Sequence, residues 1–316
     1  MKSINDDVKI EFPGIIRVYK DDFVVRLFPD LNVPPSNEDP DTGVSSKDVK
    51  VLSDDGCHSV RARLYLPKTS DSSAQKKFPV LVYFHGGAFC LRSPESMVYH
   101  RYLNILSSVA QVLIVSVKYR LAPENPLPAA YEDGWAALKL VSSNPGFDPW
   151  VAQHGDLEAL FIGGDNSGGN IVHNLAIRAG HEDLTDQNSV RIRGAFLSHP
   201  YILDERSAKV DVAYKMWEFV YPGAPGGSNC HMINPMSPGA PSLSRLGCSR
   251  MLVLVAGKDD MRDSEIRYYN AVKESGFQGK VELYVQEGED HVYHIVNPDA
   301  ENSKLLFKHL ADFLHK

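Results

Sequence analysis

The chain has 316 residues, of which 43% are hydrophobic, so it can bury a large core, and α/β proteins of this length often fold as one unit. Its formal net charge of −7 comes from mixed charges without a basic run, which argues against a nucleic-acid or anionic-membrane partner. No apolar stretch approaches the roughly 20 residues that span a bilayer, and the polar, acidic N-terminus does not resemble a secretory signal. Because the four cysteines lack C-x-x-C spacing, we expect neither a zinc site nor a disulfide framework, and we predict a cytoplasmic protein.

The first 46 residues are predicted to form an N-terminal arm. Short apolar pieces at 15–19 and 23–28 are followed by the Pro-rich stretch NVPPSNEDPDTG, a mixture typical of irregular structure. The arm must pack on the rest of the chain, because its aromatic side chains would otherwise lie exposed. We expect it to act as a lid.

From about residue 47 the pattern changes to strands that alternate with helices. Near-continuous apolar runs such as FPVLVYFH are typical of strands covered on both faces, and segments with helical spacing separate them. The predicted strands are 60–67, 78–85, 112–119, 159–165, 193–200, 251–257 and 281–287, and the predicted helices are 98–110, 130–144, 169–180, 264–276 and 303–315. This alternation predicts an α/β fold with a mostly parallel central sheet flanked by helices. Residues 201–250 interrupt it and are predicted to be an inserted cap within a single domain, 1–316.

The segment HGGAF, residues 85–89, follows the second predicted strand. Ligands of open parallel sheets collect beyond the carboxyl ends of the strands, so this segment borders the expected site. Its glycines let the backbone approach a ligand closely, and the N–H groups of Gly86 and Gly87 could form an oxyanion hole. The alternative is an ordinary Gly-Gly turn.

The segment GGDNSGGN, residues 163–170, joins a predicted strand to a predicted helix and is rich in glycine. It resembles the G-x-S-x-G nucleophile elbow, except that Asn166 occupies the central position and Ser167 comes one place later. The alternatives are a phosphate loop and a plain tight turn. A phosphate loop is disfavoured, since the Walker lysine is absent and the glycines do not fit G-x-G-x-x-G.

Two more polar residues follow later strands. Asp259 lies in AGKDDMRD, just past the strand at 251–257, and His291 lies in EGEDHVYH, just past the strand at 281–287. Taken singly, such residues are often a helix cap and an exposed loop histidine. The order elbow, Asp, His is the chain order of α/β-hydrolases, and the combination predicts a catalytic site. The chain contains no H-E-x-x-H or similar spacing and no cofactor signature, so we expect neither a metal nor a cofactor.

With these motifs the chain resembles, over nearly its whole length, the plant carboxylesterases of the hormone-sensitive-lipase group. The matching text is IIRVYKDDF, DPDTGVSSKDV, YFHGGAFC, KYRLAPENPLPAAYEDGW, GGDNSGGN, AGKDDMRD and EGEDHVYH. The segments HRYLNIL, LAIRAG and APGG…INP also look like 2-hydroxyisoflavanone dehydratases, a subgroup with lyases and cyclases of plant specialised metabolism. The resemblance implies an α/β-hydrolase domain whose arm helps to cover the pocket. It also implies that Asp259 and His291 form the relay and that Gly86, Gly87 and the N–H of Ser167 are the oxyanion donors.

Asn166 departs from the family pattern, because the esterases have their nucleophilic serine at this position. An amide nitrogen is delocalised into its carbonyl, so Asn166 should not form an acyl-enzyme, and Ser167 on the same elbow should face away from His291. Three interpretations stay open: an esterase whose nucleophile has been replaced, a lyase or cyclase that uses His291 as a base, and a receptor-like binding protein. Retention of both Asp259 and His291 argues against the third.

The expected substrate is a small apolar ester or carbonyl compound. Four cap residues are apolar enough to face it, namely Met216, Trp217, Phe219 and Val220. The same stripe would serve equally well to pack the cap on the core. No pattern in the chain specifies an oligomeric state.

Overall fold

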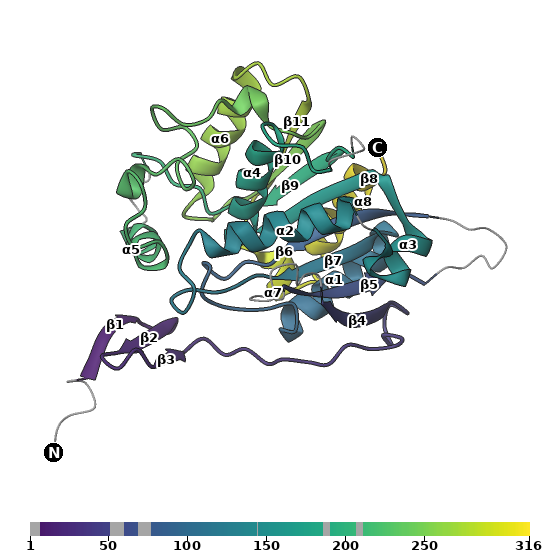
Figure 1. The fold of residues 1–316 in the computed structure, drawn as a ribbon, viewed down its shortest axis with the longest axis horizontal. Helices are drawn as coiled ribbons and strands as arrows, with labels where there is room; N and C mark the ends of the chain where they lie inside the picture. Colours follow the sequence, from purple (N-terminus) through teal and green to yellow (C-terminus); the bar gives the residue numbers. More distant parts are fainter. Residues whose placement is uncertain (1–6, 51–59, 69–76, 144, 186–189, 207–210) are drawn as a thin grey trace.

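A computed structural model of the protein describes residues 7–50, 60–68, 77–143, 145–185, 190–206 and 211–316. Its centre is an eight-stranded sheet in the order β11-β10-β9-β8-β6-β7-β5-β4 (Figure 1). The strands are β4 (Ser45–Lys50), β5 (Arg61–Leu66), β6 (Phe78–Phe84), β7 (Leu113–Lys118), β8 (Gly155–Asp165), β9 (Gly194–Ser198), β10 (Arg250–Ala256) and β11 (Lys280–Gln286). Neighbouring strands from β11 to β7 are parallel, whereas β5 and β4 are antiparallel additions at one edge, so the prediction of a mostly parallel sheet is confirmed.

Helices cover both faces of the sheet (Figure 1). They are α1 (Met97–Ala110), α2 (Ala129–Ser143), α3 (Pro149–His154), α4 (Ser167–Ala179), α5 (Asp211–Val220), α6 (Arg262–Glu274), α7 (Tyr293–Val296) and α8 (Glu301–His315). Side chains from α2, α4 and α6 share one core with the sheet, and side chains from α1, α7 and α8 share the other. The five helices predicted from the sequence are all present, and α3, α5 and α7 were not predicted.

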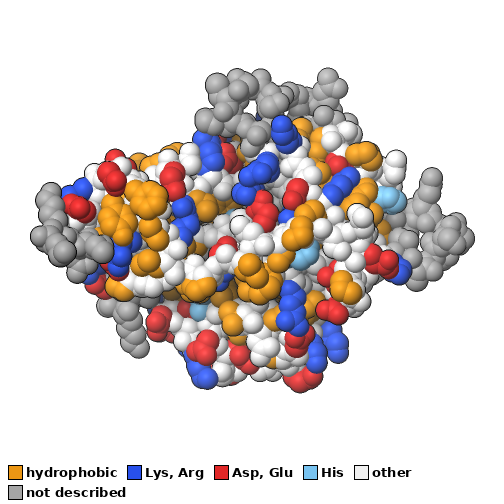
Figure 2. Space-filling view, turned by 90° about the horizontal axis from the view of Figure 1, so that it is seen from below, with side chains coloured by type: hydrophobic (Ala, Val, Ile, Leu, Met, Phe, Trp, Pro, Cys, Tyr) orange, Lys and Arg blue, Asp and Glu red, His pale blue; other side chains and the backbone are white. Residues whose placement is uncertain are grey.

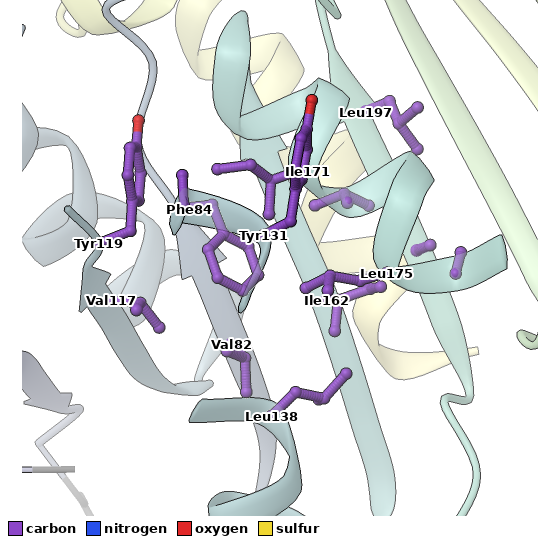
Figure 3. Close-up of a cluster of buried hydrophobic side chains, with 14 of the residues drawn as sticks. Val82, Phe84, Val117, Tyr119, Tyr131, Leu138, Ile162, Ile171, Leu175 and Leu197 are labelled. Atoms are coloured by element: carbon purple, nitrogen blue, oxygen red, sulfur yellow. The ribbon is translucent and has the colours of Figure 1, made fainter. Parts of the chain in front are cut away.

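Strand β6 shows why this sequence becomes the centre of the sheet. Val82 and Phe84 point into the α2–α4 core (Figure 3), while Tyr83 between them points to the α1–α8 side. A strand that alternates between two cores needs apolar side chains at every position, which FPVLVYF supplies. Each fully buried large side chain contributes roughly 1.5–3 kcal/mol of transfer free energy.

The arm is more regular than the sequence suggested. It forms a separate antiparallel sheet of β1 (Val8–Phe12), β2 (Ile16–Tyr19) and β3 (Val24–Arg26). The predicted irregularity is therefore wrong for these residues, because the short apolar pieces pair with one another instead of each packing alone. Phe12 of β1 packs on Phe219 of α5, with ring centroids 5.3 Å apart.

The surface on the side of the arm carries both charged and hydrophobic side chains. Seen from the side of the arm, the molecule carries interspersed positive and negative side chains, with hydrophobic ones gathered over the arm (Figure 2). Among the large hydrophobic side chains of the arm, Phe23 and Leu31 are the most exposed, at 62% and 63%. Within the part of the chain that the structure describes, no helix has the length and apolarity needed to cross a membrane.

The segment between β9 and β10 contains α5 and two short 3-10 helices, at Gly227–Asn229 and Leu243–Arg245. Its described residues form no strand, and the assignment of 201–250 as an inserted cap stays a prediction. Residues 207–210 of the predicted cap and residues 1–6 of the predicted arm lie outside the described residues.

Candidate active site

Asn166 sits on a sharp turn between β8 and α4. Its backbone angles are φ 49° and ψ −117°, a region that non-glycine residues occupy at a cost of about 1–3 kcal/mol. The turn is possible only because its neighbours are small: a Cβ on Gly168 would lie 1.9 Å from the Phe84 carbonyl oxygen. The glycines of GGDNSGGN therefore build an elbow that presents the Asn166 side chain at the end of β8.

His291 and Asp259 reach this elbow from the ends of β11 and β10. The His291 Nε2 lies 3.0 Å from the Asn166 Nδ2, and the His291 Nδ1 lies 2.5 Å from the Asp259 Oδ2. Burial opposes ionisation of Asp259, but the hydrogen bond to His291 and the attraction of its ring outweigh burial and hold the Asp259 pKa below its usual value. Asp259 is therefore a carboxylate that fixes the proton of His291 on Nδ1 and leaves Nε2 free to accept a proton.

The loop that carries His291 is stabilised by a hydrogen bond to His199, a residue that was not predicted from the sequence. His199, buried at the end of β9, accepts a hydrogen bond at Nδ1 from the Val292 backbone N–H, 3.0 Å away. Val292 has a positive φ of 50°, so this bond helps to hold an unusual backbone conformation. The only sequence signal was the position of His199 near the end of the strand predicted at 193–200.

Two backbone donors face Asn166 from the HGGAF loop. The N–H groups of Gly87 and Ala88 donate to the Asn166 Oδ1 over 3.3 and 3.0 Å. The Gly86 N–H, predicted to be one of the pair, points elsewhere and donates to the Asp165 Oδ1 and the Tyr99 hydroxyl. The two N–H groups that face the Asn166 side chain are therefore those of Gly87 and Ala88, one residue further along than the predicted pair.

Asp165 explains the shift. Its buried carboxylate accepts hydrogen bonds from Tyr83 and Tyr99, both 2.6 Å, and from the Gly86 N–H at 3.0 Å. A Cβ on Gly86 would lie 2.4 Å from the Asp165 Oδ2, so only glycine fits there. Burial raises the pKa of Asp165 to about 6 against the opposing effect of these hydrogen bonds. Asp165 anchors the loop so that the next two N–H groups turn toward Asn166.

Ser167 does not take the place of the nucleophile. Its side chain is fully buried at the first position of α4, and the group that contacts His291 is Asn166. The role of the Ser167 backbone N–H as a third oxyanion donor stays a prediction.

The site opens into a cavity of about 640 Å³. The cavity is lined by apolar and aromatic side chains, by acidic ones and by the catalytic group. The apolar and aromatic residues are Ile15, Ala88, Tyr201, Val212, Ala213, Met216 and Met261. The charged and polar residues are Asp211, Asp260, Asp290 and Lys258, together with Asn166, Asp259 and His291. Ile15 belongs to the arm, so the arm contributes a wall of the cavity.

Of the four cap residues predicted to face the ligand, only Met216 is among the lining residues. Trp217 is fully buried and packs edge-on against Phe89 and Tyr221, and Val220 is also fully buried. Phe219 packs on the arm and lines a separate cavity between the arm and α5. The apolar stripe therefore serves mainly to pack the cap, because a helix that contacts the core on one side exposes few of its apolar residues to the cavity.

Comparison with known proteins places this geometry in a family. The family description "alpha/beta hydrolase fold" matches residues 81–295, which include the loop, the elbow, Asp259 and His291. The chain belongs to the α/β-hydrolase family. Within it, the protein is an enzyme scaffold of the plant carboxylesterase type.

Three proteins similar to this chain carry different names within that family. The chain is 50% identical to a "2-hydroxyisoflavanone dehydratase" from Glycyrrhiza echinata over 98% of this chain and 96% of that protein. It is 38% identical to "Probable carboxylesterase 2" from Arabidopsis thaliana over 100% and 99%. A crystallised esterase from Pyrobaculum calidifontis has a TM-score of 0.69 at 25% identity, over 85% of this chain and 84% of that one.

Proposed function

We propose that this α/β-hydrolase works as a lyase that removes water from a β-hydroxy carbonyl compound, the class that includes a 2-hydroxyisoflavanone. The observation that carries the proposal is the makeup of the site: the His291–Asp259 base and two backbone donors face a carboxamide in place of a nucleophilic hydroxyl. Removal of a proton beside a carbonyl needs a base and oxyanion donors but no nucleophile. The name of the 50% identical relative supports this chemistry.

The elimination uses groups already in position. The substrate carbonyl oxygen replaces the Asn166 Oδ1 as the acceptor of the Gly87 and Ala88 N–H groups. His291 Nε2 removes the proton from the carbon beside the carbonyl, and the negative charge passes to the oxygen held by the two donors. The C–O bond to the β-hydroxyl then breaks as the C=C bond forms. The proton held by His291 goes to the leaving hydroxyl, so water departs and neutral histidine is restored.

Asn166 keeps a place in this scheme as a hydrogen-bonding group. Its Nδ2 carries two protons, and the one that faces His291 is released from that contact when the substrate displaces the carboxamide, so both are available to the oxygen atoms of a substrate in the cavity. Hydrolysis through an acyl-enzyme is less well supported, because the Asn166 amide nitrogen is a poor nucleophile and the buried Ser167 hydroxyl makes no hydrogen bond to His291.

The proposal is tested by dehydration of a 2-hydroxyisoflavanone, followed by mass spectrometry as loss of water with the uncatalysed rate subtracted. We expect turnover that falls about 10²–10⁴-fold in His291→Gln, because the variant lacks the base. A thermal melt that matches the parent protein establishes that His291→Gln is folded. Turnover no faster than the uncatalysed reaction, or unchanged in His291→Gln, would contradict the proposal. Binding of the compound without turnover would instead favour a receptor-like protein.

A further inference from the structure

The Asn166 side chain is held as an amide substrate would be held. Its carbonyl oxygen accepts from the Gly87 and Ala88 N–H groups at 3.3 and 3.0 Å, and its amide nitrogen lies 3.0 Å from the His291 Nε2. This orientation is fixed by its partners, since the reverse would set an NH₂ donor against two N–H donors. The carboxamide thus occupies the oxyanion hole, with its NH₂ group facing the base.

This arrangement has the parts of an amide hydrolysis site. Two donors are aimed at the oxygen that becomes negative when a nucleophile adds to the Asn166 Cγ. His291, with Asp259 on its other nitrogen, can take a proton from water and later deliver it to the leaving nitrogen. Asn166 and His291 both line the 640 Å³ cavity, and the His291 side chain is 32% exposed, so water can reach them.

From this geometry we propose that the protein deamidates its own Asn166, which makes residue 166 a site of self-modification. Water loses a proton to His291 Nε2 and its oxygen bonds to Cγ, so that Oδ1 becomes an oxyanion held by Gly87 and Ala88. The C–N bond then breaks as the proton on Nε2 goes to the departing nitrogen, so ammonia leaves a carboxylic acid, and the acid proton then passes to ammonia to give ammonium. The balance is one amide and one water to one aspartate carboxylate and one ammonium ion.

Ordinary asparagine deamidation follows a different route, in which the next backbone nitrogen attacks the side chain and a cyclic imide opens to isoaspartate and aspartate. That nitrogen belongs to Ser167, which begins α4 in a turn held tightly by Gly164 and Gly168. Ring closure there requires the elbow to rearrange, whereas attack by water does not. Direct hydrolysis therefore gives aspartate without isoaspartate, and the products distinguish the two routes.

The chain supplies its own reference residue. Asn170 lies four positions further along, in α4, and its amide is also fully hydrogen-bonded, to Tyr131, Tyr201 and Met232. No histidine is among these partners. A peptide that contains both asparagines compares an amide in the oxyanion hole with an amide in the core, under the same conditions.

The experiment incubates the purified full-length protein in heavy-oxygen water and follows this peptide by fragment-resolving mass spectrometry over days. We expect conversion at residue 166 with one heavy oxygen incorporated, no isoaspartate, and an unchanged Asn170. His291→Gln should slow the conversion by about 10²-fold or more, the usual contribution of a general base. Circular dichroism and a thermal melt identify a variant that is misfolded, and Asp259→Asn then serves as a second test of the relay.

Three outcomes overturn the inference: no conversion at residue 166, an isoaspartate product, or an equal rate in a folded His291→Gln variant. The inference does not depend on the proposed dehydration, because it needs only water and the protein. A protein that dehydrates its substrate but keeps Asn166 would refute the self-modification alone. A protein that converts Asn166 but leaves the β-hydroxy carbonyl compound untouched would refute the proposed function alone.

Discussion

At position 166 serine and asparagine differ in what they can reach from the same backbone. A serine hydroxyl ends one bond beyond Cβ, whereas the asparagine carboxamide extends further and contacts both the oxyanion donors and His291. The longer side chain thus fills the space in which an ester carbonyl would bind. Asparagine at this position removes the nucleophile and also competes for the oxyanion hole.

Asn166→Ser should therefore create esterase activity. The shorter side chain frees the Gly87 and Ala88 donors and places a hydroxyl beside the His291 base, which together complete the catalytic triad. We expect hydrolysis of short p-nitrophenyl esters to rise by about 10²–10⁴-fold over the parent protein, the range that an activated nucleophile and base supply. Release of p-nitrophenol gives the rate directly.

Asn166→Ala is the matched control, because it empties the hole without adding a nucleophile. Activity in Asn166→Ser that only equals that of Asn166→Ala would mean that the elbow no longer aligns residue 166 with His291. Activity of the parent protein equal to that of Asn166→Ser would show that Asn166 is no block to ester hydrolysis.

The same loop shows where sequence reasoning ends at the residue scale. The motifs predicted that Asn166, Asp259 and His291 lie close together, since strand ends on one edge of a parallel sheet meet, and hydrogen bonds join the three side chains in the structure. They did not show which N–H groups face the site. That choice depends on Asp165, Tyr83 and Tyr99, whose hydrogen bonds with one another and with Gly86 of the loop join residues up to 82 positions apart. A short sequence motif cannot predict a hydrogen-bond partner that lies so far away in the chain.

Among the elements, the arm is tied to the active-site loop and the residues that follow it by several side chains, of which Arg26 lies nearest to the oxyanion donors in the sequence of contacts. Arg26, at the end of β3, donates from Nε to the Cys90 carbonyl over 2.8 Å and forms a two-pronged ion pair with Glu124 at 2.9 and 2.8 Å. Cys90 in turn donates its backbone N–H to the Gly87 carbonyl. The position of the arm and that of the oxyanion loop are thus coupled through Arg26.

Arg26→Ala should loosen this coupling. Loss of charge-assisted hydrogen bonds to a partly exposed group is expected to lower the free energy of unfolding by about 1 kcal/mol. The larger effect should be a several-fold rise in KM, because Ile15 of the arm lines the cavity. Urea unfolding measures the first quantity and steady-state kinetics the second. Lys9→Ala, which removes only an exposed ion pair with Asp22 inside the arm, should change neither, and equal effects of the two substitutions would contradict the coupling.

Sequence patterns predicted the elements of the sheet better than those of the arm and cap. Long apolar runs such as β6 have few alternatives to a buried strand, so their positions were found closely. The polar edge strand β4, SSKDVK, has no such signal, because a strand at the edge of a sheet needs only alternate buried side chains. The sequence also did not predict the orientation of α5. Different residues of its apolar stripe face the core, the arm and the cavity.

At the scale of the whole molecule, the core contains several histidines that burial keeps neutral. Burial lowers the pKa of His85 to about 4 and the pKa values of His173 and His294 to about 3. A histidine whose pKa is depressed in the folded state contributes stability that is fully present above its unfolded pKa of about 6.5 and is lost as the pH falls toward the folded pKa. Asp165 acts in the opposite sense, because its raised pKa favours the folded state as the pH falls below about 6.

These opposing contributions can be separated by substituting one histidine. His173 is a suitable choice, because it lies in the core between α4 and α6, is not among the residues that line the active-site cavity, and has its Nδ1 2.8 Å from the Tyr268 hydroxyl. His173→Gln keeps a hydrogen-bonding side chain but cannot take up a proton. The parent protein should therefore lose stability relative to the variant by about 1 kcal/mol between pH 6 and pH 5, close to the limit of 1.4 kcal/mol per pH unit for one proton.

Urea unfolding of both proteins at about pH 7, 6 and 5 tests this expectation, because an unfolded histidine takes up its proton around its pKa of about 6.5. Above pH 7 the difference in stability should be constant, since neither state of His173 then binds a proton. A difference that stays constant down to pH 5 would mean that His173 is protonated equally in the folded and unfolded chains. Such a result would require that water or a carboxylate reaches a ring that is 3% exposed, and so that α4 and α6 separate readily beneath the elbow that carries Asn166.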